Sequence, residues 1–169
     1  MKEIKVTIDG KEVRLTDEQA KALKLELLLK MKSSNPFDRV GNGDRFFAID
    51  NMNGIQTCTE MSYARDEAYY SGINYFNNKK FAKQVTLHQL LYRKLLKYAY
   101  DNEFEDEEWN GTKMHAYIIY NFTRKDYDIR WTRNEKEPGT VYFKTPTMAT
   151  AALNEVVMPF VKEHPEFVW

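Results

Sequence analysis

Cysteine is almost absent from this chain of 169 residues, in which Cys58 is the only thiol. An internal disulfide and a cysteine-based zinc site each need at least two thiols, so the sequence excludes both. A single thiol is compatible with a reducing compartment. Glycine (7) and proline (5) are also few, and 43% of the residues are apolar, which indicates one compact domain or two very small ones.

An excess of one charge is missing as well, since 25 Lys and Arg balance 25 Asp and Glu. A neutral chain lacks the general attraction to phosphate backbones that a basic domain shows, and it lacks the acidic excess of a DNA mimic. No apolar run reaches the roughly 18 residues that span a bilayer. Charges also interrupt residues 1–6, where a secretion signal needs an apolar stretch. We therefore expect no membrane association and a cytoplasmic location.

The first part of the chain predicts a β-hairpin and a helix. Residues 3–15 alternate apolar and polar side chains on both sides of an Asp-Gly pair at residues 9–10, which is typical of a two-residue hairpin turn. Thr16 and Gln19 have the spacing of a capping box, and apolar residues then recur at steps of three and four. We expect residues 1–37 to form this N-terminal hairpin plus helix.

The rest of the chain carries one pattern twice. Each copy has two alternating strands, a Tyr-Phe pair that predicts a third strand, and a helix with an alanine six or seven residues after that pair. We expect two β-β-β-α units with small antiparallel sheets, over residues 38–108 and 109–169. The predicted fold class is α+β, in one compact domain or two tightly packed subdomains.

The two predicted helices differ in length and in their start signals. The first covers about residues 79–102, after Asn77 or Asn78, and its broad apolar face predicts a central helix that is buried on two sides. The second begins at Thr145-Pro146, a strong start signal. Pro159 should loosen the end of the second helix. Its expected buried stripe consists of Met148, Ala151, Ala152, Val156 and Phe160.

No residue pattern predicts catalysis, a metal site or a cofactor. His88, His115 and His164 lie on separate predicted elements, without a second ligand at helical spacing. Cys58 lies in a predicted strand, where a buried small hydrophobe accounts for it. We expect the protein not to be an enzyme, with no catalytic residues, no metal ligands and no cofactor.

A basic helix face leaves nucleic-acid binding open as an alternative. Six cations on the long helix could follow a phosphate backbone, although no known nucleic-acid-binding motif accompanies them. A charged solvent face over an apolar stem is the interpretation that we favour. These candidate residues are Lys79, Lys80, Lys83, Arg93, Lys94 and Lys97.

The aromatic content of 14% suggests a protein-binding surface. Several tyrosines gather in the predicted polar loop over residues 60–74, and tyrosine is a rigid, amphipathic anchor at protein interfaces. The alternative is that this loop folds onto its own sheet. The candidate partner-binding residues are Tyr63, Arg65, Asp66, Glu67, Tyr69 and Tyr70.

Several segments together resemble small phage- and prophage-encoded proteins of Firmicutes mobile elements. They are residues 15–19, residues 36–40 leading into 46–49, Asn74-Tyr75-Phe76, residues 117–120 and Val141-Tyr142-Phe143. The resemblance covers nearly the whole chain and carries no catalytic motif. It implies an inhibitor of host defence such as an anti-CRISPR protein, or an accessory factor for phage DNA.

The leading hypothesis from the sequence is therefore a non-enzymatic binding protein that blocks a bacterial defence nuclease through a protein surface. Its partner would be a defence protein or nucleoprotein complex, with a CRISPR nuclease among the candidates. The alternative hypothesis is a nucleic-acid-binding phage accessory protein.

Overall fold

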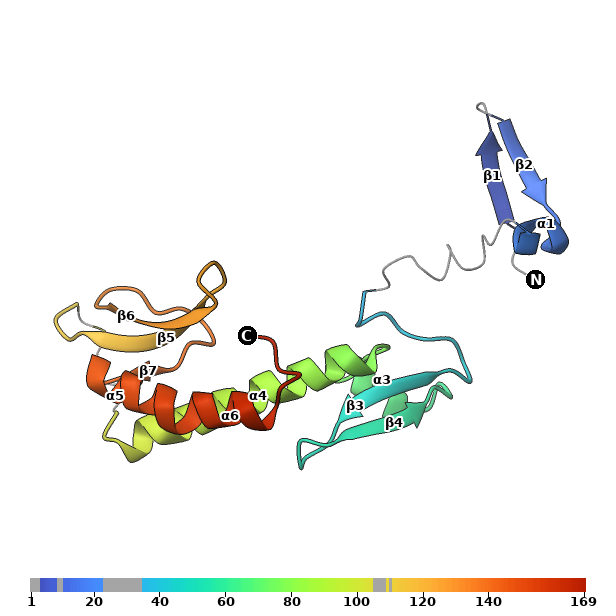
Figure 1. The fold of residues 1–169 in the computed structure, drawn as a ribbon. Coiled ribbons are helices and arrows are strands. Elements are labelled where there is room, and N and C mark those ends of the chain that lie inside the picture. Colours follow the sequence, from blue (N-terminus) through green and yellow to red (C-terminus); the bar gives the residue numbers. More distant parts are fainter. Residues whose placement is uncertain (1–3, 9–10, 23–34, 105–108, 110) are drawn as a thin grey trace.

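The computed structural model describes residues 4–8, 11–22, 35–104, 109 and 111–169. Its longest element is the helix α4 (Lys79–Asp101), which contacts both of the larger β-sheet units. Figure 1 shows one sheet beside the first half of α4 and the other beside its second half. The α+β fold with a long central helix, expected from the sequence, is confirmed.

The N-terminal hairpin forms as expected. Strands β1 (Ile4–Ile8) and β2 (Lys11–Leu15) are antiparallel, and the pairing of Ile8 with Lys11 leaves a two-residue connection. Helix α1 (Asp17–Ala22) follows. The backbone N–H of Thr16 donates to Gln19 Oε1 at 3.0 Å and that of Gln19 donates to Thr16 Oγ1 at 3.2 Å, which is the predicted capping box. The turn at residues 9–10 and the helical positions after residue 22 lie outside the described residues.

The first β-sheet unit has two strands and a bridge. Strands β3 (Arg45–Ile49) and β4 (Ile55–Thr59) are antiparallel. The predicted third strand is reduced to a bridge on the other side of β3, where Phe47 and Phe76 exchange two backbone hydrogen bonds of 2.8 and 2.9 Å. Asn78 caps the helix α4 that follows, because its side chain accepts hydrogen bonds from the backbone N–H groups of Lys80 and Phe81.

The second unit has the same strand order. Strands β5 (His115–Asn121), β6 (Asp126–Thr132) and β7 (Tyr142–Phe143) form an antiparallel sheet in the order β6-β5-β7. Thr145 caps the following helix α5 (Pro146–Ala152), as its sequence predicts. In both units the first strand is therefore central, the second lies on one side of it, and the segment that leads into the helix lies on the other.

The alanine predicted in each helix occupies an equivalent position. Ala82 and Ala149 each lie four residues after the capping residue, and both side chains are completely buried. At this position the first turn of the helix packs against its sheet. A methyl group lets the helix approach closely, whereas a larger side chain would hold it away.

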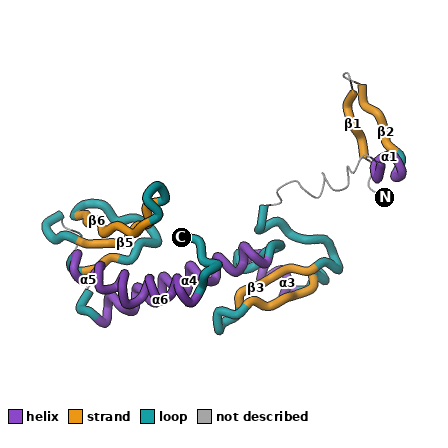
Figure 2. The backbone as a smooth tube through the Cα atoms, in the orientation of Figure 1, coloured by secondary structure: helices purple, strands orange, loops and turns teal. Residues whose placement is uncertain are grey.

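The segment predicted as a polar loop between β4 and Phe76 contains a helix instead. Helix α3 (Ala64–Ser71) begins after Tyr63 and ends at Gly72. Figure 2 shows it beside β3, and Tyr69 packs edge-on against Phe46 at 5.9 Å. The sequence lacked a strong apolar period here because only a narrow side of this short helix is covered.

The last helix is interrupted before Pro159. The π-helical segment η1 (Leu153–Val157) separates α5 from α6 (Met158–Glu163), and the N–H of Met158 donates to the Leu153 carbonyl, five residues earlier. Proline has no N–H to donate, so the helix accommodates it by widening the turn before it. The extra residue shifts the helix face, and Val157 is fully buried in place of the predicted Val156.

We expect Ala82→Leu and Ala149→Leu each to lower the free energy of unfolding by about 1 to 3 kcal/mol, because the added methylenes overpack a closed contact. The matched control is Ala68→Leu on the exposed side of α3, which should change stability little. Urea denaturation followed by circular dichroism measures all three variants. Equal stability of Ala82→Leu and the control would contradict the proposed close approach.

Candidate binding surfaces

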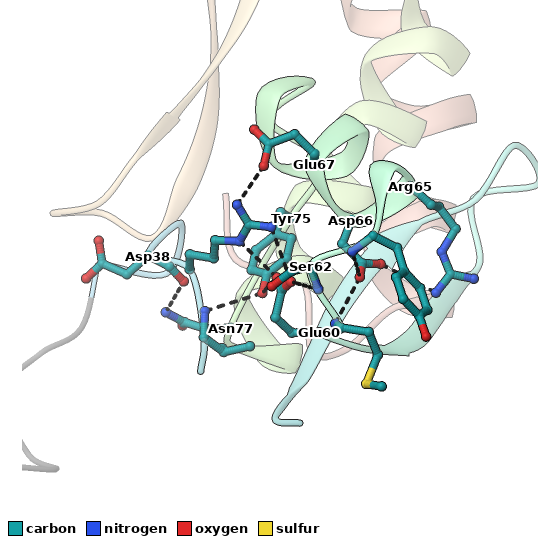
Figure 3. A network of polar contacts seen from close by, with 12 residues as sticks. Asp38, Glu60, Ser62, Arg65, Asp66, Glu67, Tyr75 and Asn77 are labelled. Carbon is teal, nitrogen blue, oxygen red and sulfur yellow. Dashed lines mark hydrogen bonds and ion pairs between the residues drawn. The ribbon is translucent and has the colours of Figure 1, made fainter. Parts of the chain in front are cut away.

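A buried carboxylate organises the loops around α3. Glu60 is only 1% exposed, and it accepts hydrogen bonds from the Arg39 guanidinium at 3.0 and 3.2 Å and from the Tyr75 hydroxyl at 2.8 Å. The Ser62 backbone N–H donates to it at 2.8 Å. Figure 3 shows Glu60 pointing toward Tyr75 and Ser62, with Glu67 on the far side of the network.

These contacts shift the pKa values of the Glu60 carboxyl and the Tyr75 hydroxyl. The Arg39 contact, assisted by Tyr75 and Ser62, lowers the pKa of Glu60 to about 2 despite its burial. Burial and the neighbouring Glu60 raise the pKa of the Tyr75 hydroxyl to about 12. Both shifts favour the same arrangement, in which a charged carboxylate accepts and a neutral hydroxyl donates. The network therefore has a structural role, because it joins the segment before β3 to β4 and to Tyr75.

Asp66 is also structural and does not lie on the protein surface. Its side chain is completely buried and accepts from the backbone N–H groups of Met61 at 3.0 Å and Tyr63 at 3.2 Å. The bond from Met61 is the main reason that the pKa of Asp66 is lowered. It is the third residue of α3, so this carboxylate holds the helix start in place. The expectation that Asp66 contacts a partner directly does not fit this burial.

The other predicted partner-binding residues divide into packed and exposed groups. Tyr69 is half-buried against Phe46, and Tyr70 packs edge-on against Tyr75 with a ring separation of 5.5 Å. Glu67 is exposed but pairs with Arg39 at 2.6 Å. Tyr63 is 60% exposed, and Arg65 is exposed beside it. The free part of this surface is therefore small, and its exposed aromatic groups are Tyr63 and Tyr70, which is 38% exposed.

The predicted basic face of α4 is interrupted by acidic and neutral partners. Lys83 pairs with Glu166 at 3.7 Å, and Lys97 pairs with Asp101 one turn later. Arg93 donates to the side-chain oxygen of Asn53. Lys94 lines a hollow together with acidic residues of η1 and α6, while Lys79 and Lys80 are exposed near the start of the helix. The six cations share a helix without forming one uninterrupted basic patch.

The described part of the chain contains an apolar groove of about 720 Å³. It lies between α4 and β5, and it is closed by the segment 137–143 on one side and the segment 164–169 on another. We call it the α4–β5 groove. Its volume is within the usual range for ligand sites. Its lining residues include Leu91, Tyr92, Arg93, Ile118, Tyr120, Phe122, Val141 and Trp169.

The segment 164–169 is held beside this groove by the Gln84 carboxamide, by the Lys83–Glu166 ion pair and by ring contacts. Gln84 Nε2 donates to the Glu166 carbonyl at 2.6 Å, and the Val168 N–H donates to Gln84 Oε1 at 3.0 Å. The Phe167 ring packs against His88 at 4.8 Å, and Trp169 packs edge-on against Tyr127 at 5.3 Å. The last aromatic residues of the sequence thus form a wall of the groove.

Sequence reasoning missed the α4–β5 groove because its walls come from three distant parts of the chain. The apolar residues of β5 and the aromatic residues of segment 164–169 were visible, but their patterns are also typical of core packing. Residue types do not report exposure, so the sequence did not distinguish Phe122, which lies in the turn between β5 and β6 and is 68% exposed.

The titratable residues considered for catalysis lie apart. His115 is buried and stacks on Trp109 at 4.0 Å, whereas His88 and His164 pack against other aromatic rings. Cys58 is half-buried in β4, where burial raises the pKa of its thiol. Within the described ranges, no three His, Cys, Asp or Glu side chains are grouped so that they could hold a metal ion.

Comparisons with known proteins give no relative. No family model matches the chain, and neither a curated protein nor a solved structure matches it. Among the described helices, none is both long and apolar enough to cross a membrane.

We expect Glu60→Gln to lower the free energy of unfolding at neutral pH by about 2 kcal/mol, because the neutral amide loses the charge-assisted bonds from Arg39. Glu67→Gln is the matched control: it removes an exposed contact of the same arginine and should have a much smaller effect. Urea denaturation of both variants provides the measurement. Equal losses would contradict a special role for the buried carboxylate.

We expect the free energy of unfolding to depend on pH through the titration of Glu60. The pKa of Glu60 falls from 4.5 to about 2 on folding, so its stabilising contribution is complete above about pH 4.5 and is lost as the pH falls toward 2. Acid titration of the unfolding free energy should therefore show a steeper decline for the wild-type protein than for Glu60→Gln. Parallel curves would exclude Glu60 as the source.

Proposed function

We propose that this protein is a non-enzymatic binding protein that recognises a protein partner through the α4–β5 groove. The observation that supports this most directly is the groove itself, a hollow of about 720 Å³ lined mainly by aliphatic and aromatic side chains. Buried apolar surface supplies most of the free energy of protein association, and aromatic anchors at such sites contribute disproportionately.

The exposed aromatic residues at the groove favour a macromolecular partner. Phe122 is 68% exposed and Tyr92 is 39% exposed, and both line the groove. An aromatic side chain left in water at the edge of a hollow is typical of a surface that is covered in a complex. The exposed part of α3 around Tyr63 is a second, smaller contact surface, in keeping with the sequence-based prediction.

The identity of the partner is proposed from the resemblance to phage-encoded proteins. We propose that it is a bacterial defence nuclease, which the protein inhibits by occupying a surface, as an anti-CRISPR protein does. The net charge of zero agrees with binding to protein rather than to a bare phosphate backbone. On this proposal, the six cations of α4 serve solubility and local ion pairs.

We expect Phe122→Ala and Tyr92→Ala each to weaken partner binding at least tenfold, because each removes an aromatic anchor. The control is Met52→Ala, which removes an even more exposed apolar side chain from the first unit. The tagged protein is used to isolate its partner from a phage-susceptible bacterium, and the purified pair is then titrated by calorimetry. The isolated partner should be a nuclease whose activity falls on binding.

The salt dependence of binding separates this function from the nucleic-acid alternative. Binding through the groove should change little between low and high salt, whereas phosphate contacts impose a steep loss. Specific DNA or RNA binding that falls steeply with salt and is weakened by Lys80→Gln and Lys94→Gln would overturn the proposed function. If the partner binds Phe122→Ala and Tyr92→Ala as tightly as the wild-type protein, the assignment of the binding site to the groove is overturned.

A further inference from the structure

One edge of the central strand β5 is left open over most of its length. Strands β5 and β6 pair over seven residues, but β7 pairs with β5 only at Ala116 and Tyr117. In the part of the chain that the structure describes, β7 does not continue its pairing with β5 past Tyr117. This open part of the strand lines the α4–β5 groove.

In the first unit, Phe76 and Asn74 cover the equivalent edge of β3. Phe47 pairs with Phe76, and two residues later the Ile49 N–H donates to Asn74 Oδ1 at 2.8 Å. Asn74 Nδ2 in turn donates to the Ile49 carbonyl at 2.8 Å. A side-chain carboxamide has the same donor and acceptor as a peptide group. Asn74 therefore takes the place of one residue of a further strand.

The second unit lacks this substitute. Ala116 pairs with Phe143 as Phe47 pairs with Phe76, so Ile118 corresponds to Ile49. The residue two places before Phe143 is Val141, whose side chain has no hydrogen-bonding group. Main-chain groups of a central strand alternate between its two neighbours. Taking Ala116 and Phe143 as the hydrogen-bonded pair, by correspondence with Phe47 and Phe76, assigns the main-chain groups of Ile118 and Tyr120 to the open side.

One arginine and one glutamate are among the groove-lining residues, Arg93 on the α4 wall and Glu137 in the segment 137–143. The hydrogen-bond partner that the structure gives the Arg93 guanidinium is the uncharged carboxamide of Asn53. An acidic side chain on a bound segment would gain a charge-assisted bond there.

We propose that an extended segment of the partner protein adds to β5 as a strand, continuing the line of β7 over Ile118 and Tyr120. This inference rests on the proposed function, whose partner it describes as an apolar extended segment with an acidic residue near Arg93. Its main chain pairs with β5, while its alternate side chains enter the apolar groove. This is recognition by strand addition, in which backbone bonds give affinity and pockets give specificity.

The test uses linear 12-residue peptides selected from a display library against the full chain. Selected peptides should be apolar with an acidic residue, and N-methylation of their alternate amides should reduce affinity at least tenfold, because it removes the strand hydrogen bonds. Peptide binding should also slow hydrogen exchange of the Ile118 and Tyr120 amides, measured by NMR. Arg93→Gln should weaken binding about tenfold.

A matched substitution in the protein tests the same edge. Val141→Asn introduces the carboxamide that closes the edge in the first unit, and it should reduce peptide affinity at least tenfold. Val141→Thr is the control, since its shorter hydroxyl side chain cannot imitate a peptide group, and it should bind nearly as well as the wild-type protein. The N-methylated peptides test the proposal on the unchanged protein, independently of any folding defect in these variants.

The outcomes separate this inference from the proposed function. Failure to select any peptide, equal binding of the N-methylated peptides, or unchanged exchange at Ile118 and Tyr120 would each overturn strand addition. If Phe122→Ala still weakens binding of the protein partner in those cases, the groove remains the binding site and only the strand pairing is wrong. If Phe122→Ala has no effect on the partner, the proposed function itself is overturned.

Discussion

The buried face of α4 is the surface that both β-sheet units share. Its first turns pack Ala82 and Thr86 toward the first sheet, and Leu87, Leu91 and Leu95 continue into the larger core formed with β5, β7 and the last helices. Each sheet is too small to bury a sufficient apolar area alone. The first sheet packs on α4, whereas the second packs mainly on α5, and α4 reaches it at β7. Residues of α4 also form one wall of the α4–β5 groove.

The two β-sheet units share one arrangement of strands and helix and differ in the segments around it. In both, a short third segment crosses beside the central strand, and a capped helix with a buried alanine follows it. The first unit adds α3 and closes its strand edge with Asn74. The second has no such carboxamide and keeps an open edge. Its difference from the first unit is thus concentrated at the place where we propose that a partner binds.

Two carboxylates near α3 have structural roles. Glu60 and Asp66 are among its most deeply buried side chains, and each accepts several hydrogen bonds. Buried carboxylates are tolerated only when such bonds replace water. The sequence showed these acids among tyrosines in a polar stretch, a composition that is also typical of interfaces. Burial, which composition does not report, distinguishes the two roles.

Local signals in the sequence determined the hairpin pairing, the caps at Thr16 and Thr145, and the long apolar face of α4, because each depends on residues a few positions apart. They left the cap of α4 open between Asn77 and Asn78, and the structure places it at Asn78. The π-helical turn before Pro159, the burial of Asp66 and the α4–β5 groove were decided only by the tertiary structure. These features depend on which distant segments pack together and on how far each strand pairs, and no local period encodes either.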